Sequence, residues 1–312
     1  MSDSVSLSII VPVYNSSKFL HLLLAEIEKE RKNENWDLEL VLVDDGSKDS
    51  SFDVIRNLSL NYNFIKAVRL SKNFGHQIAV KTGLGLVSKE YVAIIDDDLQ
   101  DPPNLLPRFL KVLQEGYDVA YGVRKKRKEH FFKRLSYSTF YRLMSLLSNI
   151  DVQLDSGDFC VMKLHVVKNM LKLREQNPFL RGMRSWVGFK QIGVEYERHS
   201  RVDGDSGYTL KKLLKIAMDG IFSFSNVPIK LITLLGCFGL FFALFYSGNL
   251  IYRYVFFGIE VRGFTSLVLM ISFFSSLILI CLGIIGEYIV RIYDEVRQRP
   301  YSIIAESINV EL

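Results

Sequence analysis

The residues best suited to chemistry are the acidic residues of the segment IIDDDLQDPP, which spans positions 94–103. Asp96, Asp97 and Asp98 directly follow an apolar run, and neighbouring carboxylates repel one another unless a cation lies between them. Hard oxygen ligands of this kind suit Mg²⁺ or Mn²⁺ bridging a diphosphate, where the metal neutralises charge on the leaving phosphate. An acidic turn at the start of a helix near Pro102 explains the segment equally well, and we interpret Asp101 as a helix cap.

Two more polar segments follow apolar runs. A carboxylate in the segment 44–47 (DDGS) can accept hydrogen bonds from a base or a ribose hydroxyl, although a simple turn with a helix cap is the favoured interpretation. The segment 12–15 (PVYN) is suited to forming the floor of a nucleotide pocket, with Tyr14 as a stacking surface. Taken alone, it is also typical of a strand-to-helix loop.

The segment LDSGDF offers Asp158 as a general base for an acceptor hydroxyl, or as an ordinary turn aspartate. A phosphate acceptor is already anionic near neutral pH, so its base would orient rather than deprotonate it. The cations of segment 124–134 (RKKRKEHFFKR) suit a diphosphate, anionic lipid headgroups or a solvated helix face. His76 and His165 have no metal-ligand spacing and are interpreted as structural.

These segments require a framework of alternating strands and helices. Short apolar runs predict strands at 7–13, 38–43, 65–70 and 91–95, and helical spacing predicts helices at 16–31, 49–60 and 76–87. Strands that alternate with helices indicate a parallel sheet with right-handed crossovers, whose ligands bind beyond the carboxyl ends of the strands. A dinucleotide fingerprint or P-loop is absent from the sequence.

Two long apolar stretches, at about 229–255 and 264–290, predict a hairpin of membrane-spanning helices of about 20 residues each. A pair of buried core helices is the alternative. Lysines 211, 212, 215 and 230 precede the hairpin and arginines 291, 297 and 299 follow it, so the positive-inside rule places both termini in the cytosol. The segment 208–224 has apolar residues at helical spacing beside three lysines, which predicts a helix on the membrane surface.

Composition narrows the class of protein. The 312 residues carry a formal net charge of +5, and we find no recognisable nucleic-acid-binding module, so we expect no nucleic-acid partner. The three cysteines form no close pair, which favours reduced thiols. The N-terminal residues lack a basic region and a cleavage site, so we expect no signal peptide and a cytosolic first domain.

Together the motifs resemble one family. PVYN, VDDGS, SKNFGHQIAVKTGL, IIDDDLQDPP, SGDF and DGIFSFSNVPIK occur in this order before a helical hairpin. The chain, over about residues 5–300, is similar to polyisoprenyl-phosphate glycosyltransferases, which are family 2 glycosyltransferases of the GT-A fold. Dolichol-phosphate mannose synthase and bactoprenol glucosyltransferases belong to this group. The resemblance implies an α/β fold with a Rossmann-like, mostly parallel sheet and flanking helices.

The resemblance also implies roles for single residues. Pro12, Tyr14 and Asp45 match positions that hold the base and ribose of the nucleotide, and Arg124 and Arg201 match basic positions near phosphate.

The resemblance further implies which residues bind the metal and take part in the reaction. Asp96 and Asp98 match the D-x-D pair that binds Mg²⁺ or Mn²⁺, with Asp98 the main ligand, and Asp97 joins the substrate-binding residues. Gln100 matches a glutamine beside the sugar-phosphate, and Asp158 matches the proposed catalytic aspartate.

Two positions depart from the family pattern. Ser16 stands where the family commonly has glutamate after PxYN, which puts the identity of the nucleotide in doubt. Gly207 stands where a lysine is often found before the surface helix, which weakens one expected phosphate or sugar contact.

The resemblance predicts a catalytic domain at 1–205, an interface helix at 206–228, two transmembrane helices at 229–290 and a cytosolic tail at 291–312. We expect inverting transfer of a sugar, with a UDP-sugar as donor and a polyisoprenyl phosphate such as undecaprenyl phosphate as acceptor. The product would serve modification of cell-envelope glycans. The expected location is the cell (inner) membrane, with membrane lipid as a partner. A homo-oligomer and a flippase partner are compatible with this expectation.

Two alternatives remain at this stage. A processive polysaccharide synthase would usually carry a Q-x-x-R-W segment and more membrane helices, and only the residues 181–186 (RGMRSW) come near that segment. A non-catalytic membrane scaffold or flippase accessory would have no need for Asp96, Asp98 or Asp158.

Overall fold

The computed structural model describes residues 4–124, 156–173, 175–176, 178–197, 227–257 and 263–310. The described residues form two compact units. One unit contains a sheet with its helices and includes the chain from Arg299 onward, and the other contains two long helices. Arg201 and most of the expected surface helix at 206–228 lie outside the described residues.

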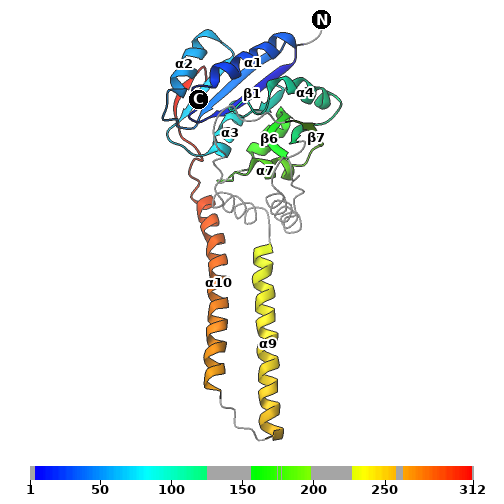
Figure 1. Cartoon of the computed structure of the whole chain (residues 1–312), viewed down its shortest axis with the longest axis vertical. Coiled ribbons are helices and arrows are strands. Elements are labelled where there is room, and N and C mark those ends of the chain that lie inside the picture. The colour runs from blue at the N-terminus through cyan, green and yellow to red at the C-terminus, as the bar shows by residue number, and fades with distance from the viewer. Residues whose placement is uncertain are drawn as a thin grey trace. The chain divides into compact units, whose positions relative to one another are not determined.

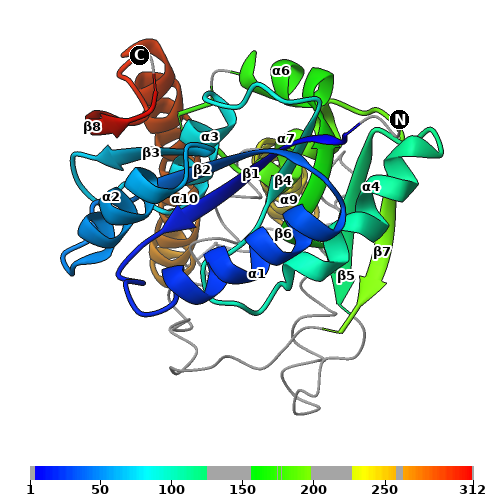
Figure 2. The ribbon, with the colours of Figure 1, turned by 90° about the horizontal axis from the view of Figure 1, so that it is seen from above.

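Within the described residues the sheet has eight strands in the order β7-β5-β6-β4-β1-β2-β3-β8. Figure 1 shows the elements along the chain, and Figure 2 shows these strands from above. The strands are β1 (Ser6–Val13), β2 (Asp37–Asp44), β3 (Ile65–Leu70), β4 (Tyr91–Ile94), β5 (Val119–Arg124), β6 (Ser156–Lys163), β7 (Gln191–Tyr196) and β8 (Ile304–Ile308). Strands β4, β1, β2 and β3 run parallel, as β5 and β7 do. Strand β6 runs antiparallel to β4 and β5, and β8 runs antiparallel to β3.

Helices cover both faces of the sheet, as Figure 2 shows from above. On one face lie α1 (Leu20–Asn33), α2 (Ser51–Asn61) and α4 (Leu106–Gln114), which follows the short helix η1 (Pro103–Leu105). On the other lie α3 (His76–Leu84), α6 (Leu164–Leu171) and α7 (Leu180–Trp186). Because the sheet is covered twice, its central strands are mostly apolar on both sides, with Ser8 and Glu39 as buried polar exceptions.

The alternation of side chains along β1 divides the core. Leu7, Ile9 and Val11 face α1, whereas Ile10 faces α3, and all four are fully buried. Helix α3 approaches this strand closely, since a Cβ placed on Gly83 would lie 2.5 Å from Cγ2 of Ile10. A glycine at this position therefore lets the helix that follows β3 pack directly on the sheet.

The expected strands and helices are present with small shifts at their ends. Helix α1 begins at Leu20 rather than at Ser16, and α3 ends at Leu84 rather than at Val87. The sequence did not predict β5, β6, β7 or β8. The last of these lies within residues 291–312, which were expected to form only a tail.

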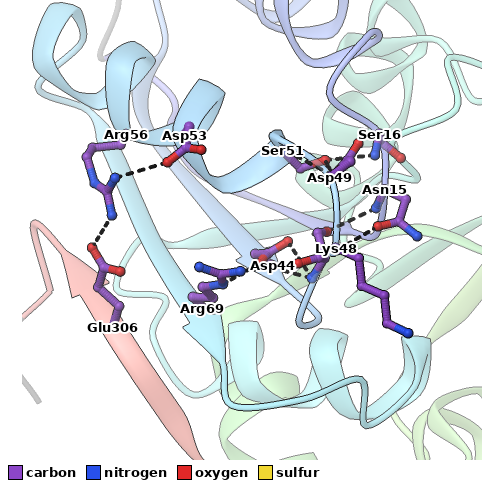
Figure 3. A network of polar contacts seen from close by, with 11 residues as sticks. Asn15, Ser16, Asp44, Lys48, Asp49, Ser51, Asp53, Arg56, Arg69 and Glu306 are labelled. Carbon is purple, nitrogen blue, oxygen red and sulfur yellow. Dashed lines mark hydrogen bonds and ion pairs between the residues drawn. The ribbon is translucent and has the colours of Figure 1, made fainter.

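The chain after Arg299 is an integral part of the sheet unit. Ile308 pairs with Ala67 across β8 and β3, and Arg56 on α2 contacts Glu306 at 2.7 Å (Figure 3). Two side chains just before β8 also contact α3. The hydroxyl of Ser302 lies 2.8 Å from that of Thr82, and Lys81 Nζ lies 4.7 Å from the ring centre of Tyr301.

The second unit holds α9 (Val227–Phe257) and α10 (Phe264–Val296). The most apolar 18-residue windows of their segments Ile232–Phe257 and Ser266–Val296 have mean hydropathies of 1.8 and 2.7, and only 6% and 0% of these windows are buried within the protein. By length and composition both are able to cross a membrane. The alternative of two buried core helices does not fit such exposed apolar surfaces.

Candidate active site

The loops that follow β1 and β2 are tied together by hydrogen bonds (Figure 3). The amide of Asn15 donates to Ser47 Oγ at 3.0 Å, and the amide of Lys48 donates to Asn15 Oδ1 at 2.8 Å. Ser16 donates its amide to Ser51 Oγ at 2.9 Å. Because β1 and β2 are neighbours, these contacts hold two adjacent strand ends in a fixed relation.

Asp97 joins the loop after β1 to the end of β4. Its Oδ2 accepts the amide of Tyr14 at 3.3 Å. Burial raises the pKa of this carboxyl, and hydrogen bonds from the side chain of Ser16 and the amide of Tyr14 partly oppose that shift. The hydroxyl of Ser16, the residue that departs from the family's glutamate, donates to the Tyr14 carbonyl at 3.2 Å, beside the acidic segment. The ring of Tyr14 is 42% exposed and can offer a stacking surface.

Asp45 organises a loop. Its two carboxylate oxygens accept the amides of Phe74 at 2.7 Å and Gly75 at 2.9 Å, and its side chain is buried. Burial raises the pKa of Asp45, while the two amides oppose the shift. These contacts fix the segment that leads into α3, which begins at His76. The expected contact with a base or ribose is not tested by the described structure and stays a prediction.

The register of the sheet brings Asp96 and Asp158 together. Strands β4 and β6 are antiparallel, and their last pair at this end is Ile94 with Cys160. Asp158, still on β6, and Asp96, just past the end of β4, lie two residues beyond that pair, so they occupy facing positions at the edge of the sheet. His76 Nε2 bridges the two carboxyl groups, at 3.7 Å from Asp96 Oδ1 and 3.5 Å from Asp158 Oδ2.

Asp158 is held by three further contacts. Arg181 Nε donates to Oδ1 at 2.8 Å, and its Nη2 donates to Oδ2 at 3.2 Å. Gln77 Nε2 donates to Oδ2 at 3.3 Å. Burial alone would raise the pKa of Asp158, but the Arg181 guanidinium and His76 hold it well below its usual value. Asp158 is therefore an ionised, paired carboxylate.

His76 and Asp96 also have shifted pKa values. Partial desolvation would lower the pKa of His76, but the carboxylates of Asp158, Asp96 and Asp97 raise it to about 9. Burial raises the pKa of Asp96 to about 6; His76 opposes this shift, and nearby carboxylates add to it. Whether His76 is purely structural is not tested, but its imidazole lies between two expected site residues.

The chain turns sharply after the aspartates. Leu99 adopts a left-handed conformation with φ 58°, which costs a non-glycine residue about 1 kcal/mol or more. The amide of Gln100 donates to Asp98 Oδ1 at 3.2 Å, and the side chain of Gln100 is buried. Asp101 accepts a hydrogen bond from the Tyr196 hydroxyl on β7, and η1 has no side-chain cap, so its expected role as a cap was wrong.

The remaining expected site residues lie away from the cluster around Asp158 or outside the described residues. Pro12 is buried in β1, where it pairs with Val43 of β2. Arg124 is the last residue of β5, and its side chain is outside the described part. The resemblance assigned no role to Gln77 or Arg181. Gln77 stands inside the quoted motif SKNFGHQIAVKTGL, and Arg181 was considered only as part of a weak Q-x-x-R-W match.

The donor chemistry of the site fits a divalent cation. Four carboxylates, from Asp96, Asp97, Asp98 and Asp158, gather near the end of β4, against the cations of His76 and Arg181. Within the described ranges, no group of three His, Cys, Asp or Glu side chains is arranged to enclose a metal. The assignment of Asp96 and Asp98 as metal ligands therefore stays a prediction.

A doubly covered, mostly parallel sheet with acidic groups near the carboxyl ends of its central strands is typical of α/β enzymes, in which ligands commonly bind at that edge. The family model described as "Glycosyl transferase family 2" matches residues 8–171, which include β1 to α6. The chain belongs to glycosyl transferase family 2, and the protein is a glycosyltransferase.

Relatives match over nearly the whole chain. "Uncharacterized glycosyltransferase YkcC" of Bacillus subtilis is 42% identical over 100% of this chain and 97% of its own length. "SfII prophage-derived bactoprenol glucosyl transferase" of Shigella flexneri is 34% identical over 97% of this chain and 98% of its own. Among solved structures, the mannosyltransferase PcManGT from Pyrobaculum calidifontis in complex with GDP-Man and Mn2+ is 15% identical. That match covers 90% of this chain and 88% of PcManGT, with a TM-score of 0.46.

Proposed function

We propose that this glycosyltransferase moves a sugar from a nucleotide-sugar to a polyisoprenyl phosphate at the cytoplasmic face of the cell membrane. The observation that carries the proposal is the combination, in one chain, of an acidic site at the sheet edge with two exposed apolar helices. Full-length relatives that are named bactoprenol glucosyl transferases support a lipid acceptor. We propose a UDP-sugar as donor and undecaprenyl phosphate as the first acceptor to test.

The position of β8 supports the expected topology. The chain enters α9 from the sheet unit and returns after α10 to pair β8 with β3 in the same sheet. If both helices cross the membrane, the two ends of the helical segment must lie on one side, since a sheet cannot be assembled from both sides of a bilayer. The positive charges that flank the helices favour the cytoplasmic side.

The place where the two substrates can meet follows from their solubility. A polyisoprenyl chain cannot leave the bilayer cheaply, because each exposed CH₂ costs about 0.8 kcal/mol. A nucleotide-sugar cannot enter the bilayer, because its phosphates are charged. The reaction therefore takes place at the headgroups, where a basic residue such as Arg201 is proposed to meet the acceptor phosphate.

The residues at the end of β4 are proposed to hold Mg²⁺ or Mn²⁺ through Asp98, assisted by Asp96. The bound cation would stabilise negative charge on the departing diphosphate. Tyr14 would stack on the base. The ionised Asp158 would orient groups at the reaction centre and would not remove a proton.

A transfer assay tests the proposal. The full-length protein in detergent is incubated with undecaprenyl phosphate and, in turn, labelled UDP-glucose, UDP-N-acetylglucosamine and GDP-mannose, with Mg²⁺ or Mn²⁺. We expect label from one donor to enter the organic phase as a lipid-phosphate sugar, and orders of magnitude less of it with Asp98→Asn. A processive synthase would instead build a water-soluble polymer, and an accessory protein would give no product with any donor; either result would contradict the proposal.

A further inference from the structure

Three elements distant in sequence meet at the carboxylate of Asp158. The carboxylate lies on β6, Gln77 reaches it from the first turn of α3, and Arg181 reaches it from the first turn of α7. Gln77 is 81 positions from Asp158, and Arg181 is 23 positions away. Only the folded sheet unit can bring them together, so the relative placement of these helices sets the orientation of the carboxylate.

Gln77 links all three elements through one amide group. Its Nε2 donates to Asp158 Oδ2 at 3.3 Å, while its Oε1 accepts the backbone amide of Leu180 at 3.0 Å. Leu180 is the first residue of α7, where backbone amides lack partners within the helix. The oxygen of the Gln77 amide therefore holds the start of α7, the helix that carries Arg181. Its nitrogen holds the carboxylate of Asp158, which pairs with Arg181.

Arg181 fixes the carboxylate through two parallel contacts. Its Nε and Nη2 lie 2.8 and 3.2 Å from the two oxygens of Asp158. A planar guanidinium in this two-point geometry restricts rotation of a carboxylate, which a lysine ammonium does not do. The side chain of Asp158 is only 14% exposed, so the pair is largely shielded from solvent.

We propose that Gln77 and Arg181 are positioning residues that hold Asp158 as a fixed, ion-paired carboxylate, a role that rests on the proposed transfer to a phosphate acceptor. Such an acceptor needs no general base, because the second pKa of a phosphate monoester is about 6. An acceptor oxygen attacks the anomeric carbon with its own electron pair. The bond from that carbon to the diphosphate breaks, and its electron pair leaves with the nucleoside diphosphate. No proton is transferred, so an aspartate held by a guanidinium is compatible with turnover.

Four variants and one control separate positioning from a purely structural role. Arg181→Gln removes the two-point pair, and Arg181→Lys restores only the charge. Gln77→Ala removes both contacts of the amide, whereas Gln77→Glu keeps an acceptor for the Leu180 amide and turns a second carboxylate toward Asp158. Arg56→Gln is the matched control, because Arg56 pairs with carboxylates of Asp53 and Glu306 away from the site.

The assay measures kcat and KM for each substrate in the full-length protein in detergent, together with the melting temperature. We expect Arg181→Gln and Gln77→Glu to lower kcat on the order of 10²-fold, the effect of misplacing a reacting group by about 1 Å. The KM for the nucleotide-sugar should change less than about 3-fold, since a lost positioning contact acts on the reaction step. Arg181→Lys should recover part of the kcat, and the control should match the wild type.

Each outcome has one meaning. If Gln77→Ala lowers kcat and Gln77→Glu does not, Gln77 acts only by capping α7 and its positioning role is overturned. If Arg181→Gln keeps or raises kcat, Asp158 does not need the ion pair for turnover, and the role of Arg181 is overturned. If wild type and control both transfer no sugar to lipid from any donor, the proposed function fails and takes this inference with it.

Discussion

The buried contacts of Glu39 are expected to contribute more to the free energy of unfolding than an exposed ion pair on the same strand does. It is a buried glutamate of β2, only 4% exposed, and its carboxylate accepts four donors. They are the hydroxyl of Ser8, the amide and hydroxyl of Ser88, both at 2.9 Å, and Nζ of Lys66 at 2.6 Å. The substitution Glu39→Gln keeps the shape of the side chain and removes its charge.

The size of the effect follows from these contacts. Hydrogen bonds to a charged group contribute about 1.5–3 kcal/mol each, against about 1 kcal/mol between neutral groups. One carboxylate oxygen becomes an NH₂ group that cannot accept a hydrogen bond, so the three bonds from the serines would together lose about 3 kcal/mol. The lower cost of burying a neutral amide returns part of that. We expect Glu39→Gln to lower the free energy of unfolding by about 2 kcal/mol, or the melting temperature by about 4–8 °C.

The effect should depend on pH in a fixed direction. Burial would raise the pKa of Glu39, but the hydrogen bonds from Lys66, Ser8 and Ser88 outweigh it and leave the pKa below its ordinary value of 4.5. A lowered pKa in the folded state contributes stability that is present above the unfolded pKa and is lost as the pH falls through the folded one. The difference between wild type and Glu39→Gln should be full at pH 6 and shrink below about pH 4.5.

The assay is thermal unfolding in detergent, followed by tryptophan fluorescence. Trp36 is 4% exposed and lies just before β2, whereas Trp186 is 62% exposed, so a Trp186→Phe background isolates the signal of the core. Asp37→Asn is the matched control, because Asp37 pairs with Lys89 at 2.6 Å on the surface, where such a pair contributes about 0.2–1 kcal/mol. A loss for Glu39→Gln no larger than that of the control would refute the reasoning.

Three further predictions concern the site and its support. Asp98→Asn should lower transfer by orders of magnitude with an unchanged melting temperature, and full activity of the wild type in chelator would contradict metal dependence. Arg201→Ala should raise the apparent KM for lipid phosphate far more than that for nucleotide-sugar, so an unchanged lipid titration would remove Arg201 from the acceptor site. Gly83→Val should destabilise the protein by about 1–3 kcal/mol, because its Cβ would lie 2.5 Å from Ile10; a melting temperature equal to wild type would show that α3 can shift.

The first half of the fold was predictable because its signals are local. Strands β1 to β4 are mostly apolar, and each is followed by a helix or a turn with polar residues. Such runs predict a strand, and its place inside a parallel sheet, from the local sequence alone. The first half of the site followed from the same pattern, since Asp96 to Asp98 end a predicted strand.

The second half depends on pairings between distant segments. Strand β6 combines Gly157 and Asp158 with apolar residues, and its antiparallel pairing with β4 has no local mark in the sequence. The bridge from His76 to Asp96 and Asp158 exists only because of that register. A search for metal-ligand spacing could not find it. A glycine-bounded histidine opening a helix after the third strand, GHQ at 75–77, was the available signal.

The return of the chain to β3 also governs how this protein can be made. Arg56 and Glu306 are 250 positions apart, so at synthesis rates of about 5–20 residues per second their contact forms about 10–50 s after Arg56 is made. Until then β3 is an edge strand with unpaired backbone groups. A nascent chain therefore completes its catalytic sheet only after both apolar helices have been made. Any chain that stops between the helices leaves the edge of β3 exposed, where it can pair with the strand of another chain.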